Sequence, residues 1–154
     1  MRKHSLLAAA LLAMAVHAAP LPYDETADAK ADIKQALSAA KSSQVPVLVI
    51  FGANWCQDCR ALDRALQTGK NAELVKREFK VVKVDVGNFN KNLDVAEAYG
   101  NPIKKGIPAA VVLSPDNKVL YATRLGELAD ARSMSETRIY DFFKGVTQAS
   151  KKKP

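Results

Sequence analysis

Two cysteines separated by two residues are the side chains of this sequence best suited to chemistry. They stand in the segment Trp55-Cys56-Gln57-Asp58-Cys59, and the 154-residue chain contains no other cysteine. A three-residue offset on a helix brings two sulfurs onto one turn, where a disulfide can close a small ring. Free N–H groups and the positive dipole end of the helix favour a thiolate at Cys56, the form that attacks disulfides. The pair predicts thiol–disulfide exchange, with Cys56 as nucleophile and Cys59 as resolving thiol.

The remaining composition excludes several other kinds of chemistry. The two histidines are His4 and His17, so every residue after 17 is without an imidazole. This argues against Ser-His-Asp and Cys-His hydrolases and against the common His-ligated metal sites. Two cysteines are too few for a four-cysteine zinc site or a disulfide-dense mini-protein. The net charge of +7 comes without a basic stripe interleaved with aromatics, so we expect no nucleic-acid binding.

The first residues are typical of a targeting signal. Arg2 and Lys3 precede the uncharged apolar stretch Leu6–Val16, and small residues follow around Ala18. This is the layout of a secretory signal peptide, and the stretch is short of the ~20 apolar residues that span a bilayer. We expect cleavage near Ala18, with an uncleaved anchor as the alternative.

Cleavage would divide the chain into a signal peptide, residues 1–18, and a single domain, residues 19–154. We expect the mature protein in the periplasm, as a monomer without stable membrane insertion. Disulfides persist in such an oxidising compartment, which suits a redox-active cysteine pair.

The elements that must position the cysteines alternate between helix and strand. Val45–Phe51 is a continuous apolar, β-branched run, as expected for a central strand buried on both faces. A helix should begin near Cys56, and a final helix should begin at the capping box Ser133–Glu136. The other predicted elements are helices over Asp24–Ser43, Asn71–Glu78 and Asn92–Tyr99 and strands over Phe79–Val86, Ala109–Leu113 and Lys118–Ala122.

This order predicts an α/β fold with a small mixed sheet covered by helices on both faces. We expect about four strands and a possible additional edge strand. Strands separated by helices should pair in parallel, and the terminal hairpin should add an antiparallel strand.

The cysteine pair belongs to a wider pattern of residues. The apolar strand precedes Trp-Cys-x-x-Cys, Lys83-Val84-Asp85 lies in the next strand, and Gly106-Ile107-Pro108 precedes the last hairpin. Over about Val45–Phe143 the chain therefore resembles a secreted member of the thioredoxin superfamily. The resemblance implies a thioredoxin-like fold and protein disulfide oxidoreductase activity. It also implies a cis Ile107–Pro108 bond beside Cys56, where the Ile107 backbone would pair with a bound substrate strand.

Two departures from thioredoxin bear on the mechanism. Gln57-Asp58 replaces the Gly-Pro dipeptide between the cysteines, and Ile50 replaces a buried acid thought to assist proton transfer to the second cysteine. Proton transfer at Cys59 must then use water, Asp58 or a group such as Lys83. A carboxylate beside a thiolate disfavours the thiolate. We therefore hypothesise that Asp58 makes the protein a reductant or isomerase rather than a strong oxidant.

The expected substrates are proteins with disulfides, and the redox group is the Cys56–Cys59 disulfide itself, without a metal or other cofactor. Turnover as a reductase would need an electron donor, for which we expect a membrane-embedded thiol relay. Trp55, with Gln57, Asp58, Ile107, Pro108 and Lys83, is expected to support the substrate site.

Other interpretations of the same residues stay open. The pair could be a structural disulfide, or it could serve a non-catalytic protein that either carries Cu(I) or binds a partner protein through the same surface. Trp55 could serve packing alone, and Lys83 could be an ordinary strand residue. No role is assigned to the segment Leu125–Arg132.

Overall fold

A four-stranded mixed sheet positions the rest of the molecule. The strands are β1 (Val47–Gly52), β2 (Lys80–Asp85), β3 (Ala109–Leu113) and β4 (Val119–Ala122), in the order β2-β1-β3-β4. The computed structural model describes residues 20–152, so the expected signal peptide, residues 1–18, lies outside it. The predicted mixed sheet is confirmed.

β1 is the central strand, as its apolar run predicted. All its residues are buried, and it pairs with β2 on one side and β3 on the other. Because side chains alternate along a strand, Val49 and Phe51 pack on one face of the sheet, and Leu48 and Ile50 on the other. The end of this strand is therefore firmly fixed by two hydrophobic clusters.

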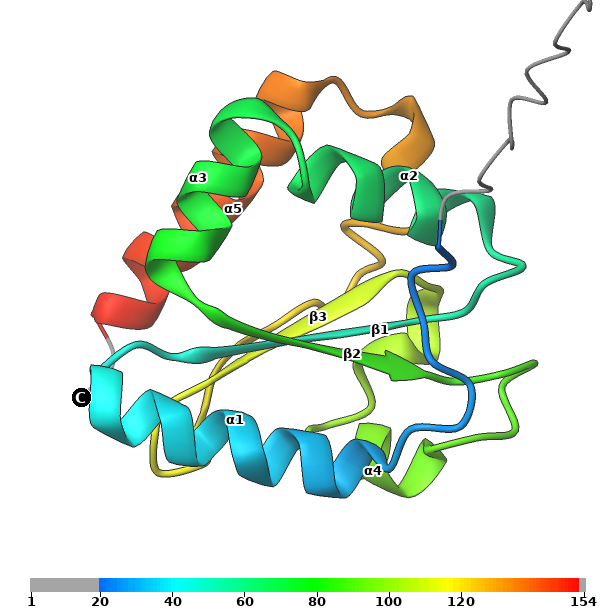
Figure 1. The fold of residues 1–154 in the computed structure, drawn as a ribbon. Coiled ribbons are helices and arrows are strands. Elements are labelled where there is room, and N and C mark those ends of the chain that lie inside the picture. The colour runs from blue at the N-terminus through cyan, green and yellow to red at the C-terminus, as the bar shows by residue number, and fades with distance from the viewer. Residues whose placement is uncertain (1–19, 153–154) are drawn as a thin grey trace, which may run out of the picture.

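Helices cover both faces of the sheet (Figure 1). One face carries α1 (Ala29–Ser43) and α4 (Leu93–Ala98), and the other carries α2 (Gln57–Leu66), α3 (Gly69–Glu78) and α5 (Glu136–Lys151). Two short 3-10 helices are η1 (Pro102–Lys105) and η2 (Ala131–Ser133). Within residues 20–152, no helix is long and apolar enough to cross a membrane.

Two helices, α1 and α5, begin later than predicted, because in each the capping side chain belongs to a residue further along the chain. α1 begins at Ala29 rather than Asp24, since the Asp28 carboxylate accepts the N–H groups of the first turn. α5 begins at Glu136 with Ser135 as its cap, whereas the proposed cap Ser133 closes η2.

The direction of β3 also differs from the expectation of parallel pairing across helices. β3 runs antiparallel to β1. β2 ends opposite Gly52 and β3 begins opposite Phe51, so the connection through α4 passes from one side of β1 to the other but starts and finishes at the same end of the strands. At that end β1 finishes and the cysteine segment follows.

Candidate active site

The cysteine pair lies at the start of α2, just beyond the end of β1. Cys56 is the N-cap residue, and its Sγ accepts the backbone N–H of Cys59 at 3.1 Å. The two sulfurs form a disulfide, and both residues are buried, Cys56 at 5% and Cys59 at 1% exposure. After reduction, the same N–H group and the helix dipole would stabilise a thiolate at Cys56. Of the two residues Cys56 is slightly the more exposed.

Ile107 and Pro108 lie against this pair although they are far away in sequence. The carbonyl oxygen of Ile107 is 3.7 Å from Cys56 Sγ, and the Ile107–Pro108 peptide bond is cis. η1 ends just before this dipeptide and β3 begins just after it. The fold thus brings together two of the motifs that carry the family resemblance.

Trp55 lies at the surface beside the pair rather than in the core. Its side chain is 54% exposed, and its Nε1 donates a hydrogen bond to the carbonyl oxygen of Gly87 at 2.9 Å. Phe89, 44% exposed, packs edge-on against the indole, with 6.2 Å between the ring centroids. The loop after β2 and the segment before Cys56 therefore present an exposed aromatic pair next to the disulfide.

The two residues between the cysteines are held by a distant part of the chain. The backbone N–H of Arg132 donates to Asp58 Oδ1 at 3.0 Å, and its guanidinium donates to Gln57 Oε1 at 2.6 Å. Arg132 Nε also lies 3.6 Å from Asp58 Oδ1. The carboxylate that the sequence placed beside the cysteines thus has a cationic partner in the structure.

Lys83 points to the opposite side of the pair, behind Cys59. Its Nζ forms an ion pair with Oδ1 of Asp63, whose Oδ2 accepts a hydrogen bond from Gln67 at 2.6 Å. Asp63 and Lys83 line a cavity of about 190 Å³ together with Cys59 and Tyr23. Lys83 is therefore part of a charged group beside Cys59.

Tyr23 closes this cavity from the segment before α1. Asn54 holds the segment in place, because its side chain accepts the Tyr23 N–H at 3.0 Å and donates to the Tyr23 carbonyl at 2.9 Å. The hydroxyl of Tyr23 lies against Gly52, and a Cβ added there would also come within 2.9 Å of Cys59 Sγ. The Tyr23 hydroxyl and Cys59 Sγ thus both lie close to Gly52.

Burial raises the pKa of the Tyr23 hydroxyl far above its usual value, and the nearby carboxylates of Asp63 and Asp85 raise it further. The phenol therefore stays protonated over the physiological pH range. The neutral hydroxyl can donate a hydrogen bond to a neighbouring anion, and it does not serve as a phenolate base in this range.

Sequence reasoning missed four residues of the site. Asp63 had a usable signal, since it follows Cys59 by one helical turn and so lies on the same helix face. Tyr23, Phe89 and Arg132 had none, because only the fold brings their segments to the cysteines.

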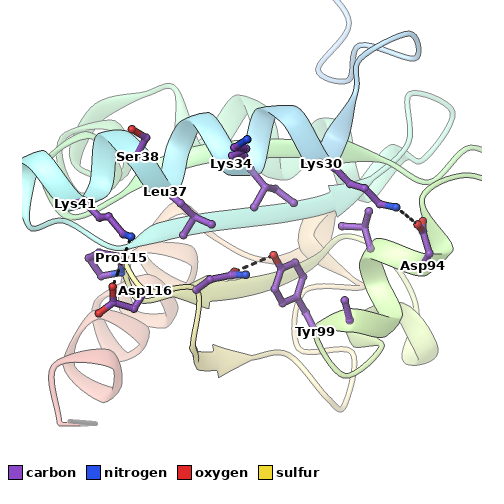
Figure 2. A pocket seen from close by; sticks show the side chains of 13 residues that line it. Lys30, Lys34, Leu37, Ser38, Lys41, Asp94, Tyr99, Pro115 and Asp116 are labelled. Atoms are coloured by element: carbon purple, nitrogen blue, oxygen red, sulfur yellow. Dashed lines mark hydrogen bonds and ion pairs between the residues drawn. The ribbon is translucent and has the colours of Figure 1, made fainter.

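The structure also contains hollows away from the pair. One groove of about 680 Å³ lies between α1, α4 and the turn after β3 (Figure 2). The ion pairs Lys30–Asp94 and Lys41–Asp116 mark its two ends. Its lining contains none of the candidate site residues that were predicted from the sequence. Within the described residues 20–152, no group of three or more His, Cys, Asp or Glu side chains is placed to hold a metal ion.

Comparison with known proteins agrees with this geometry. Residues 28–115 match the model of a family described as thioredoxin-like. A disulphide isomerase from Xylella fastidiosa Temecula1 has a similar crystal structure, with 56% sequence identity and a TM-score of 0.82. The match covers 84% of this chain and 99% of the Xylella chain.

Two further solved structures are similar in fold alone. The C-terminal domain of Neisseria meningitidis DsbD, in the oxidised form, is 23% identical with a TM-score of 0.51, covering 62% of this chain and 82% of that domain. A thioredoxin from Thermus thermophilus is 20% identical with a TM-score of 0.52, covering 75% of this chain and 81% of the thioredoxin. No curated protein matches the chain in sequence.

Proposed function

This chain belongs to the thioredoxin-like family, and we propose that it exchanges disulfides in protein substrates in the periplasm, as an isomerase or reductant. It is a thioredoxin-like disulfide oxidoreductase whose redox group is its own Cys56–Cys59 disulfide. The observation that carries the proposal is the position of Cys56, which caps α2 and contacts the carbonyl of Ile107.

The exchange proceeds in two balanced steps from the reduced pair. The Cys56 thiolate attacks one sulfur of a substrate disulfide, which forms a mixed disulfide and releases one substrate thiolate that takes up a proton. Cys59 then attacks Cys56 Sγ, which forms the Cys56–Cys59 disulfide and releases the second substrate thiolate. The substrate gains two electrons and the cysteine pair loses them. In isomerisation, a second substrate thiolate attacks the mixed disulfide instead, and the pair stays reduced.

Cys59 must lose a proton before it attacks, and Asp63 is the side chain that we assign to accept it. Asp63 and Cys59 line the same cavity, and Lys83 balances the carboxylate when it is ionised. The Tyr23 hydroxyl, which lies beside Cys59 across Gly52, is placed to donate a hydrogen bond to the resulting thiolate. Asp58 is less suited to this task, because it does not line the cavity that Asp63 and Cys59 share.

Substrate would dock where the aromatic pair meets the dithiol. Trp55 and Phe89 provide an exposed apolar surface, and Ile107 offers its backbone to an extended substrate segment. Protein segments with an apolar side chain near the disulfide suit such a surface.

The isomerase or reductant role is supported by the name of the Xylella protein, which is 56% identical to this chain. Strong oxidants of this chemistry depend on an exceptionally stable thiolate in the reduced form. The Asp58 carboxylate opposes such a stable thiolate, although Arg132 offsets part of its effect.

The periplasmic location rests on the basic and apolar start of the chain, with residues 19–154 as the mature single domain. An exported reductase needs electrons from elsewhere, and a membrane-embedded thiol relay is the donor that this compartment suggests. We propose that the protein acts as a monomer.

Turnover of a protein disulfide tests this function. The reduced protein should accelerate insulin reduction by dithiothreitol, and Cys56→Ser should abolish the acceleration. The same preparations should be titrated with Cu(I), since two thiolates are also soft metal ligands. Tight Cu(I) binding without insulin reduction would contradict the proposal and favour a copper carrier.

A further inference from the structure

The segment between β4 and α5 is fixed against the first turn of α2. Leu128 and Ala131 anchor it, at 0% and 1% exposure, in the hydrophobic cluster that includes Leu62 of α2. The segment is thus packed into the core of the domain, and its buried residues place Arg132 beside α2.

Arg132 makes three contacts with the two residues that separate the cysteines. Its backbone N–H donates to Asp58 Oδ1, its guanidinium lies 3.6 Å from the same oxygen, and Nη1 donates to Gln57 Oε1. The Asp58 side chain is only 16% exposed in this arrangement, whereas that of Arg132 is 59% exposed. A carboxylate that is largely withdrawn from water beside a reactive sulfur is thereby paired with a cation from another part of the fold.

We propose that Arg132 is a positioning residue that holds Gln57 and Asp58 and offsets the Asp58 charge, so that the reduced protein keeps Cys56 available as a thiolate. The Asp58 carboxylate alone destabilises a neighbouring negative sulfur, and the guanidinium opposes this effect. Arg132 therefore tunes the reactivity of the pair without touching the reacting atoms. This inference rests on the proposed function, since exchange is the activity that uses the thiolate.

Charges on the surrounding elements must stay constant for a fair test. Besides Asp58 and Arg132, the charged side chains on α2, β2, η1 and η2 with its N-cap are Arg60, Asp63 and Arg64 of α2, Lys80, Lys83 and Asp85 of β2, Lys104 and Lys105 of η1, and Asp130 before η2. The variants below leave all of them unchanged. Differences among these variants therefore report the Asp58–Arg132 pair.

The test is a pH titration of the Cys56 thiolate in the reduced protein, followed by its ultraviolet absorbance and by its rate of alkylation. Arg132→Ala leaves Asp58 unbalanced, so the Cys56 pKa should rise and the thiolate fraction at acidic pH should fall about three- to tenfold. Asp58→Asn leaves Arg132 unbalanced and should shift the pKa in the opposite direction. The double variant should return close to the wild-type value.

Arg124→Ala is the matched control, since Arg124 is an exposed arginine of the same segment that makes none of these contacts. It should leave the titration unchanged. A merely structural role for Arg132 would give shifts of the same sign in both single variants and no recovery in the double variant, which would overturn the inference. The titration needs no substrate, so it can succeed even if insulin reduction fails, and the two proposals are tested separately.

Discussion

At the scale of single residues, the proton acceptor assigned to Cys59 comes from a helix rather than from the central strand. Ile50 leaves the strand position without a carboxylate, and Asp63 supplies one from α2, paired with Lys83. The buried phenol of Tyr23 lines the same cavity as Asp63 and Cys59. A buried cysteine needs such polar neighbours, because desolvation otherwise disfavours its thiolate.

Replacing Asp63 should slow the second step of the exchange and leave the first unchanged. In Asp63→Asn, no carboxylate accepts the Cys59 proton, and the mixed disulfide should resolve about tenfold more slowly, or more, at pH 7. The defect should shrink as the pH rises toward ~8.5, where a thiol loses its proton unaided. Rapid-mixing kinetics of mixed-disulfide decay measure this effect. Asp141→Asn, at an exposed position of α5, is the control, and equal decay rates in both variants would refute the assignment.

At the scale of elements, β1 and α2 place the cysteine pair. The segment before α1 contributes Tyr23 to its surroundings, and the segment before α5 contributes Arg132. Much of this could be predicted, because a strand buried on both faces leaves a continuous apolar run such as Val47–Gly52. The antiparallel direction of β3 could not, since it depends on the end of the strands at which the connection through α4 finishes. Nor could the contacts of Tyr23 and Arg132, since these residues come from segments whose docking leaves no periodic pattern.

Two glycine substitutions test how tightly the end of β1 is packed. In Gly52→Ala, the new methyl group would overlap the Tyr23 ring and crowd Cys59 Sγ, so the free energy of unfolding should fall by about 1–3 kcal/mol. In Gly145→Ala, an exposed position of α5 with no atom near the new methyl group, it should rise by about 0.5–1 kcal/mol. Denaturant unfolding of the reduced proteins measures both. Equal, small effects would show that Tyr23 does not pack against Gly52 as described.

At the scale of the whole molecule, the features suited to chemistry lie at one end of the sheet. This is the end where β1 finishes, and it holds the cysteine pair, the aromatic residues Trp55 and Phe89 and the cavity behind Cys59. The groove between α1 and α4 on one face contains no cysteine and is bordered by ion pairs (Figure 2). We therefore expect substrates to meet the protein at the end of the sheet where β1 finishes, with the covered faces serving stability.

Export makes a separate prediction for the full chain. If residues 1–18 are a signal peptide, the protein recovered from the periplasm of an expressing bacterium should have lost them and should begin close to Ala19. Intact mass spectrometry of the periplasmic fraction measures this directly. A full-length mass confined to the cytosol would contradict the proposed location and the membrane-embedded donor that follows from it.

The most direct test of the account is the capture of its mixed disulfide. Cys59→Ser keeps the Cys56 nucleophile but removes the resolving thiol, so this variant, reduced and mixed with a disulfide-bonded protein, should accumulate a covalent adduct joined through Cys56. Intact mass spectrometry identifies the adduct, reducing agent should release it, and Cys56→Ser should form much less. If Cys59→Ser traps no substrate, or if both variants trap it equally, Cys56 is not the nucleophile that the structure indicates.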